Sequence, residues 1–130
     1  MREPGVLVVD DNPEILAVIE RIFSYFKIKV DSFTSAISAL DSLQKKSYKT
    51  MIIAIDMQDM VGMELANQAH NIDPELNVVV FVADSAEQLL KLILDPTILD
   101  ISEIPLKSYT FGKMLLDIKY RENGKIFLLE

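Results

Sequence analysis

Short apolar runs alternate with longer segments whose apolar residues recur at helical spacing, and this alternation limits the possible folds of the 130-residue chain most strongly. Strands are expected at residues 6–9, 27–33, 51–56, 77–83 and 99–104. Helices are expected from Pro13, from Thr34 or Ser35, from about residue 63 to before Pro74, from Asp84 or Ser85 to about Leu94, and over residues 105–120. Such alternation is typical of βαβ units, so we predict an α/β fold.

The start of the first helix has the clearest signals. Asn12 is a candidate N-cap, and Pro13 suits the first helical position. The apolar stripe of this helix consists of Ile15, Leu16, Ile19, Ile22, Phe23 and Phe26. Because crossovers between parallel strands are right-handed, few topologies remain. We predict a doubly wound, five-stranded parallel sheet in the order 2-1-3-4-5, with helices on both faces.

Acidic residues follow two of the predicted strands. Asp10 and Asp11 come after the first strand, and Asp56 ends the third. In the predicted order these strands are neighbours, and ligands of such sheets bind beyond the carboxyl ends of the strands. Three carboxylates close together repel one another unless water or a cation separates them. A divalent cation such as Mg²⁺, which prefers oxygen ligands, is therefore the expected ligand.

Composition excludes several other functions. The net charge of −7 argues against a nucleic-acid surface, and no run of apolar residues is long enough for a signal peptide or a membrane span. There is no cysteine, and His70 is the only histidine, so a disulfide, a zinc site and a histidine-based catalytic triad are not expected. We expect a cytoplasmic protein.

The sequence motifs of enzymes that have related folds are also missing. The turn after the first strand lacks the glycines of a dinucleotide-binding site, and no phosphate-binding P-loop is present. Phosphatases of the haloacid dehalogenase class need a second Asp two residues after the nucleophile. Asn12 follows Asp10 at that distance, and Gln58 follows Asp56.

Four stretches, "VLVVDDNPE", "IIAIDMQDMVGMEL", "DPELNVVVFVA" and "DISEIPL", together resemble the receiver domain of two-component response regulators over about residues 5–118. The resemblance implies a flavodoxin-like fold and transfer of a phosphoryl group from a sensor histidine kinase or phosphotransfer protein. Asp56 falls on the phosphoacceptor, and Asp11 on a direct Mg²⁺ ligand. Asp10 falls on the acid that holds the ion mainly through water, and the backbone carbonyl of Gln58 is a further ligand. The only chemistry implied is self-catalysed phosphoryl transfer and hydrolysis.

The chain departs from the family at the positions that respond to phosphorylation. Val82 replaces the usual Thr or Ser, Ile101 replaces the aromatic switch residue, and Ile104 replaces the Lys before Pro105. Pro105 itself is a candidate for a cis peptide bond or a loop position. Two hypotheses follow: a phosphorylatable receiver with altered switching, or a receiver-like docking module that works without phosphorylation.

The loop after Asp56 is also unusual. Gly62 follows Asp56 by six residues instead of the family's eight, and Asp59 adds another negative charge.

Residues 1–120 are expected to form the receiver-like domain, and residues 121–130 a tail or the start of a linker to an effector domain. The apolar "KIFLL" near the end either packs on the domain or precedes a continuation of the chain. The apolar segment "AEQLLKLIL" is either core or part of a homodimer face built from the fourth helix, fifth strand and fifth helix.

Overall fold

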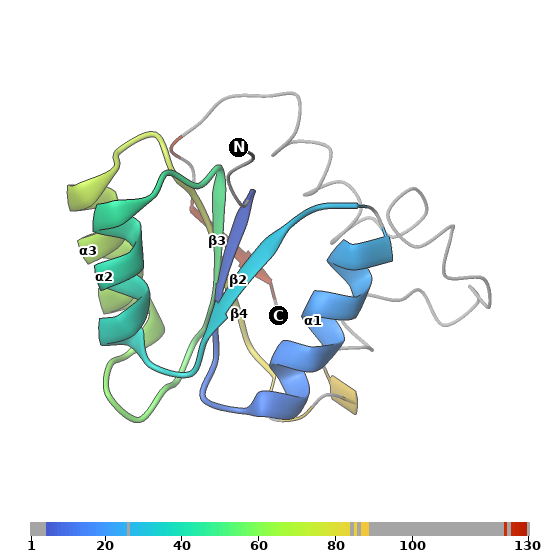
Figure 1. Ribbon diagram of the computed structural model, residues 1–130. Coiled ribbons are helices and arrows are strands. Elements are labelled where there is room, and N and C mark those ends of the chain that lie inside the picture. Colours follow the sequence, from blue (N-terminus) through green and yellow to red (C-terminus); the bar gives the residue numbers. More distant parts are fainter. Residues whose placement is uncertain are drawn as a thin grey trace.

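The computed structural model describes residues 5–25, 27–83, 85, 87–88, 124 and 126–129 of the chain. In chain order its elements are β1 (Val6–Val9), α1 (Pro13–Tyr25), β2 (Val30–Phe33), α2 (Ala36–Lys45), β3 (Thr50–Ala54), α3 (Gly62–Ile72), β4 (Asn77–Phe81) and β5 (Ile126–Leu129). Figure 1 shows the sheet in the middle, with α1 on one face and α2 and α3 side by side on the other. The predicted α/β architecture is confirmed.

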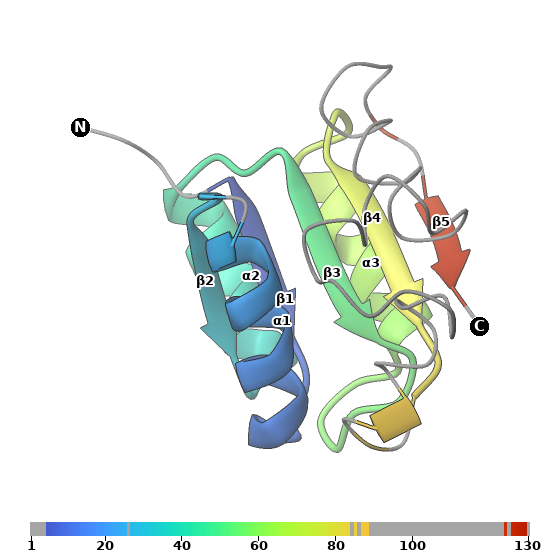
Figure 2. The same cartoon turned by 90° about the vertical axis from the view of Figure 1, so that its right-hand side faces the viewer.

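The strands form one parallel sheet in the order β2-β1-β3-β4-β5. Figure 2 shows them side by side. Val9, which ends β1, is opposite Ile53 near the end of β3. The residues that follow these two strands therefore emerge at the same edge of the sheet, where the strand order reverses. This is the predicted doubly wound order, and this edge is where such sheets bind ligands.

Alternate residues of the strands enter two cores, one on each face of the sheet. The core on the α1 side consists of Val6, Val8, Ile15, Leu16, Ile19, Ile22, Phe23, Ile52, Ala54, Val79 and Phe81. The core on the α2 and α3 side consists of Leu7, Val9, Ala36, Ala39, Leu43, Tyr48, Met51, Ile53, Leu65, Ala66, Ala69, Leu76, Val78 and Val80. Because helices cover both faces, β1, β3 and β4 need apolar residues at successive positions, and this is why they appear in the sequence as continuous apolar runs.

The first two helices begin at the predicted caps. The side-chain oxygen of Asn12 accepts a hydrogen bond from the N–H of Glu14 at 2.9 Å, and Pro13 is the first residue of α1. Ser35 is the N-cap of α2, and its hydroxyl accepts from the N–H of Ser38 at 3.3 Å. Each cap satisfies an N–H that has no carbonyl partner within the helix.

The strand beside β4 comes from a later part of the chain than the sequence indicates. The strand predicted at residues 99–104 lies outside the described residues, as do the fifth helix and most of the fourth. In the structure β5 pairs with β4, with Ile126 opposite Val78. The apolar run near the end of the chain thus pairs with the domain, which is one of the two alternatives given above. The domain boundary at residue 120 stays a prediction.

Gly124 precedes β5 and meets the turn before β4. Its N–H donates to the carbonyl of Glu75 at 2.9 Å, and its φ is +81°. A Cβ atom at this position would lie 2.6 Å from the carbonyl oxygen of Pro74. Both the left-handed conformation and the close approach therefore require glycine.

Candidate functional site

Three carboxylates lie at the carboxyl edge of the sheet. Asp10 and Asp11 follow β1 directly, and Asp56 is the second residue after β3. All three line one hollow of about 170 Å³, here called the acid hollow. Its described lining residues are Asp10, Asp11, Asn12, Ile15, Ala54, Ile55, Asp56 and Ala83. The structure therefore brings together the three acids that the strand order predicted to be neighbours.

Asp10 is the buried member of the three, with an exposed fraction of 3%. Its Oδ1 accepts a hydrogen bond from the N–H of Asn12 at 2.9 Å, whereas its Oδ2 has no partner among the described residues. Burial raises the pKa of Asp10 to about 6; the hydrogen bond from Asn12 opposes this rise, and the neighbouring Asp11 contributes to it. The buried Oδ2 is therefore an acceptor without a donor among the described residues.

Asp11 and Asp56 are exposed. The Oδ2 of Asp11 accepts a hydrogen bond from the backbone N–H of Gln58 at 3.0 Å. This contact joins the loop after β3 to the loop after β1 across 47 residues. The resemblance to receiver domains implied a role for the carbonyl of Gln58, and the structure adds a contact through its N–H that no sequence pattern predicted.

The loop between Asp56 and Gly62 is tightly folded. Asp56 and Val61 form an antiparallel bridge, and the N–H of Gly62 donates to the carbonyl of Ile55 at 2.7 Å. A Cβ atom on Gly62 would lie 2.3 Å from the carbonyl oxygen of Ala54 and 2.9 Å from the Cα of Ile55. The backbone of α3 thus approaches the end of β3 so closely that only glycine fits.

The donors around the acid hollow suit a hard divalent cation. They are carboxylate oxygens, and one of them, Oδ2 of Asp10, is buried with no hydrogen-bond partner in the part of the chain that the structure describes. Within the described residues, no three Asp, Glu, His or Cys side chains are already arranged as a metal cluster. Mg²⁺ does not need such a cluster, because it is usually bound by one or two carboxylates and several waters. The residues present therefore fit the ion.

The fold and this geometry agree with the comparison with known families. The model of the response regulator receiver domain matches residues 6–118. The chain belongs to this family. A curated relative of the receiver domain is the response regulator receiver protein CpdR of Brucella abortus (strain 2308), which is 26% identical over 84 residues, or 65% of this chain and 70% of CpdR.

Solved structures show the same fold. A CheY-like receiver domain from Methylobacillus flagellatus has a TM-score of 0.63 at 18% identity, with 90% of this chain and 99% of that chain covered. A CheY-like receiver domain protein from Methanospirillum hungatei JF-1 has a TM-score of 0.62 at 17% identity, with 98% of this chain and 82% of that chain covered. The flavodoxin-like arrangement predicted for the receiver domain is therefore confirmed.

Asp59 has a role in this receiver domain that the sequence alone did not reveal. Its Oδ2 accepts hydrogen bonds from the hydroxyl of Ser35 at 2.9 Å and from the N–H of Ile37 at 3.3 Å, and its Oδ1 accepts from the N–H of Ala36 at 3.2 Å. Slight burial raises the pKa of Asp59, but the hydrogen bonds from Ala36, Ser35 and Ile37 outweigh it, so the pKa is lowered. No local pattern could predict this cap, because it joins residues 22 to 24 positions apart.

The predicted switch positions are only partly described. Val82 follows β4 directly, and 40% of it is exposed. Ala83, the next residue, lines the acid hollow. Ile101, Ile104 and Pro105 lie outside the described residues, so the consequences of these replacements stay predictions.

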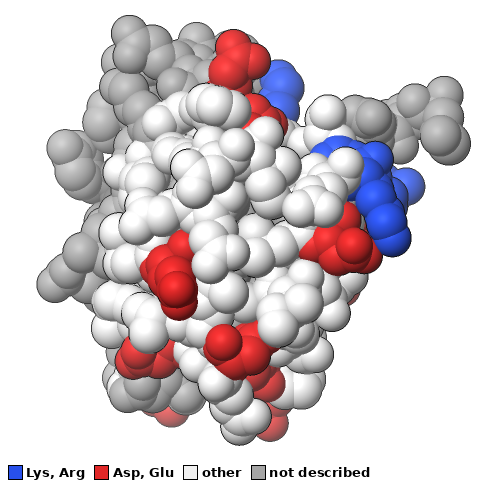
Figure 3. Space-filling view, turned by 90° about the vertical axis from the view of Figure 1, so that its left-hand side faces the viewer, with Lys and Arg blue, Asp and Glu red and all other residues white. Residues whose placement is uncertain are grey.

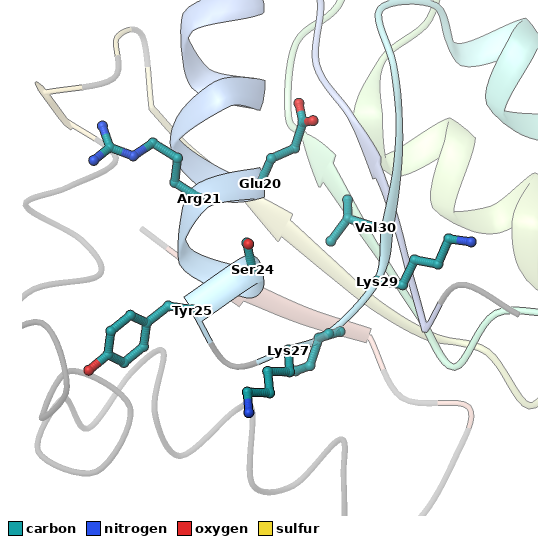
Figure 4. A pocket seen from close by; sticks show the side chains of 8 residues that line it. Glu20, Arg21, Ser24, Tyr25, Lys27, Lys29 and Val30 are labelled. Atoms are coloured by element: carbon teal, nitrogen blue, oxygen red, sulfur yellow. The ribbon is translucent and has the colours of Figure 1, made fainter. Parts of the chain in front are cut away.

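A larger hollow of about 770 Å³ lies near the end of α1, at the opposite edge of the sheet. Its described lining residues are Glu20, Arg21, Ser24, Tyr25, Lys27, Ile28, Lys29 and Val30. Figure 4 shows that Arg21, Lys27 and Lys29 point in different directions instead of toward one point. Their arrangement does not form a converging anion site, so the acid hollow remains the better candidate.

The surface formed by α2 and α3 is shown in Figure 3. Acidic side chains are scattered over a mostly uncharged surface, and the basic groups lie at its upper end. At the lower end, which is the edge of the acid hollow, the described surface shows Asp and Glu but neither Lys nor Arg. The electrostatic potential at the lower end of the α2 and α3 surface therefore favours cations over anions near the candidate site.

Proposed function

We propose that this receiver domain accepts a phosphoryl group on Asp56 from the phosphohistidine of a sensor histidine kinase or phosphotransfer protein. The observation that carries the proposal is the acid hollow, where Asp56 is exposed beside Asp10 and Asp11. The family membership supports this reaction, because receiver domains are signalling domains. We propose no chemistry beyond phosphoryl transfer to Asp56 and hydrolysis of the product.

In the proposed step, a carboxylate oxygen of Asp56 attacks the phosphorus atom. The O–P bond forms as the P–N bond of the donor breaks, and the histidine nitrogen keeps the electron pair and takes up a proton. Asp56 is exposed, so a donor protein can reach it. The negative charges of Asp10 and Asp11 oppose the approach of a phosphoryl group, so the reaction needs a cation.

We propose that Asp11, Asp56 and the backbone carbonyl of Gln58 hold Mg²⁺ directly and that Asp10 holds it through water. When bound, the ion neutralises charge on the phosphoryl oxygens and fixes their orientation. The support from the structure is the position of Gln58 beside Asp11 and the buried Oδ2 of Asp10, which accepts no hydrogen bond from any described residue.

We infer that switching after phosphorylation is altered. The side chain of Val82 has no hydroxyl with which to hydrogen-bond a phosphoryl group. Ile104 has no charge with which to attract one, and Ile101 is not aromatic. The receiver domain would then be phosphorylated without the usual rearrangement.

The alternative function is a docking or dimerisation module that works without phosphorylation. Three apolar side chains near the loop after Asp56 favour it, because Ile37 is 64% exposed, Val61 53% and Met63 40%. Exposed apolar groups close together are typical of contact surfaces. A homodimer through the fourth helix, fifth strand and fifth helix remains a further proposal.

The other partners follow from the family. We propose a cytoplasmic location and an effector domain in the same polypeptide, and we propose no contact of this domain with nucleic acid or membrane. Among the described helices, none is long and apolar enough to cross a bilayer.

The proposal is tested with acetyl phosphate and Mg²⁺, followed by intact-mass measurement. The expected result is a mass increase of one phosphoryl group that is lost in Asp56→Asn and in the presence of a chelator. Asp41→Asn is the matched control, because it removes an acid that lies on α2 and pairs with Lys45. An unchanged mass, with a competent receiver domain reacting alongside, would reject phosphorylation and leave the docking function.

A further inference from the structure

Asp59 joins two parts of the molecule that the proposed reaction needs in a fixed arrangement. Its carboxylate lies at the N-terminus of α2, where it accepts hydrogen bonds from the hydroxyl of Ser35 and from the N–H groups of Ala36 and Ile37. Its backbone belongs to the loop that starts at Asp56. The loop is therefore attached to α2 by a side chain that comes three residues after the proposed phosphoacceptor.

The hydrogen bonds of Asp59 add to a cap that α2 already has. Ser35 already supplies a local cap, since its hydroxyl accepts from the N–H of Ser38. Asp59 satisfies the N–H groups of Ala36 and Ile37, the two residues before Ser38, and its charge suits the positive end of the helix dipole. Hydrogen bonds to an ionised carboxylate are stronger than neutral ones, so this contact holds the loop as well as the helix.

The neighbouring residue, Gln58, contacts the acid hollow. Its N–H donates to Asp11 at 3.0 Å. The carbonyl of Gln58 and the N–H of Asp59 belong to one planar peptide unit, so a fixed Asp59 restricts the plane in which this carbonyl lies. That carbonyl is the atom proposed above as a metal ligand.

We propose that Asp59 is a positioning residue: by capping α2 from the loop after Asp56, it orients the Gln58 peptide at the acid hollow and so sets cation affinity and the rate of phosphoryl transfer. The inference rests on the proposed function. Asp59 does not touch the reacting atoms, and it acts through Gln58.

The test compares Asp59→Ala, which removes the cap, with Asp59→Asn, which removes the charge but keeps an acceptor oxygen. Asp73→Ala is the matched control. It also removes an acid that accepts a backbone hydrogen bond, from Glu75 at 3.1 Å, but it lies between α3 and β4, away from the acid hollow. Mg²⁺ affinity is measured by calorimetry, the acetyl phosphate reaction by intact mass at saturating Mg²⁺, and stability by urea unfolding.

For Asp59→Ala we expect Mg²⁺ affinity to fall about fivefold and the phosphorylation rate at saturating Mg²⁺ to fall about tenfold, because small displacements of positioned groups slow reactions strongly. Asp59→Asn keeps one acceptor oxygen but loses the charge and the second acceptor, so it is expected to regain part of the rate. In Asp73→Ala the rate is expected to stay at the parent value even if stability falls. Amide exchange at Gln58 is expected to speed up in Asp59→Ala only.

Several results would overturn the inference. If Asp59→Asn were as slow as Asp59→Ala, the effect would be one of charge, and if Asp73→Ala were equally slow, it would be one of stability. If Asp59→Ala were phosphorylated as fast as the parent chain, the positioning role would also be excluded. If Asp59→Ala does not fold, Ser35→Ala replaces it, since this variant removes one donor to Asp59 and should lower the rate in the same direction.

The failure of the proposed function gives a different result. A parent chain that neither binds Mg²⁺ nor takes a phosphoryl group rejects both the function and this inference. A reactive parent with an equally reactive Asp59→Ala rejects the inference alone.

Discussion

At the scale of single residues, Asp10 has surroundings that oppose its own charge. Its carboxyl is buried, one of its oxygens has no described partner, and Asp11 is adjacent. In the unfolded chain the proton leaves near the ordinary pKa of 3.8, whereas in the folded chain it leaves near 6. The folded state therefore binds the proton more tightly, and without metal its stability falls as the pH rises from about 4 to about 6.

We predict that Asp10→Asn is more stable than the parent at pH 8 without metal. The expected gain in free energy of unfolding is on the order of 1–3 kcal/mol, and it shrinks to below about 1 kcal/mol at pH 4, where the carboxyl is protonated in the folded parent and partly protonated in the unfolded chain. Urea unfolding in a chelator at the two pH values measures this. Asp41→Asn is the control and should change little, because Asp41 is exposed. A gain of the same size at pH 4 would contradict the explanation.

The second residue-scale prediction concerns Gly62. We expect Gly62→Ala to lower the free energy of unfolding by about 1–3 kcal/mol, because the new Cβ would collide with backbone atoms of Ala54 and Ile55. Gly5→Ala is the control. Its Cβ would lie 3.5 Å from Ile28, an ordinary contact, so a change within about 0.5 kcal/mol is expected. Equal effects of the two substitutions in urea unfolding would show that the close approach at Gly62 is not the cause.

At the scale of helices and strands, the parts set by local pattern could be predicted, and those set by distant contacts could not. Asn12 and Ser35 predict the starts of α1 and α2, because a helix cap acts on residues close to it in sequence. Strand order also brought Asp10 and Asp56 together correctly. The hydrogen bonds from Asp59 to α2 and from Gln58 to Asp11 join segments far apart in the chain, and their residue types are not specific to these contacts.

β5 is the element that the sequence placed least well, and it leads to a prediction of its own. A chain that ends at residue 120 is expected to lose amide-exchange protection at residues 78–81, because these residues of β4 pair with β5. Residues 50–53 of β3 should stay protected, since they lie between β1 and β4. Hydrogen exchange read by mass spectrometry or NMR compares the two chains. Unchanged protection at residues 78–81 would mean that another segment, such as residues 99–104, pairs with β4.

At the scale of the whole molecule, the net charge of −7 and the acid hollow predict stabilisation by Mg²⁺. At ten times the dissociation constant, binding to the folded state alone adds about 1.4 kcal/mol to the free energy of unfolding. Thermal unfolding with MgCl₂ is compared with NaCl at equal ionic strength, which controls for general screening. The difference between the salts should shrink in Asp11→Asn and in Asp56→Asn. A difference that persists in both variants would place the cation elsewhere.

The direction of β5 decides where an attached group begins. β5 runs parallel to β4, with Leu129 opposite Phe81, so its last residue lies at the same rim of the sheet as Asp10 and Asp56. A dye, tag or fused partner attached close after Leu129 starts towards this rim, two strands away from β3, whereas one attached ahead of Gly5 starts at the opposite rim. A small reporter attached after Leu129 therefore shares a rim with Asp56 and is better placed to sense an approaching donor protein than one attached ahead of Gly5.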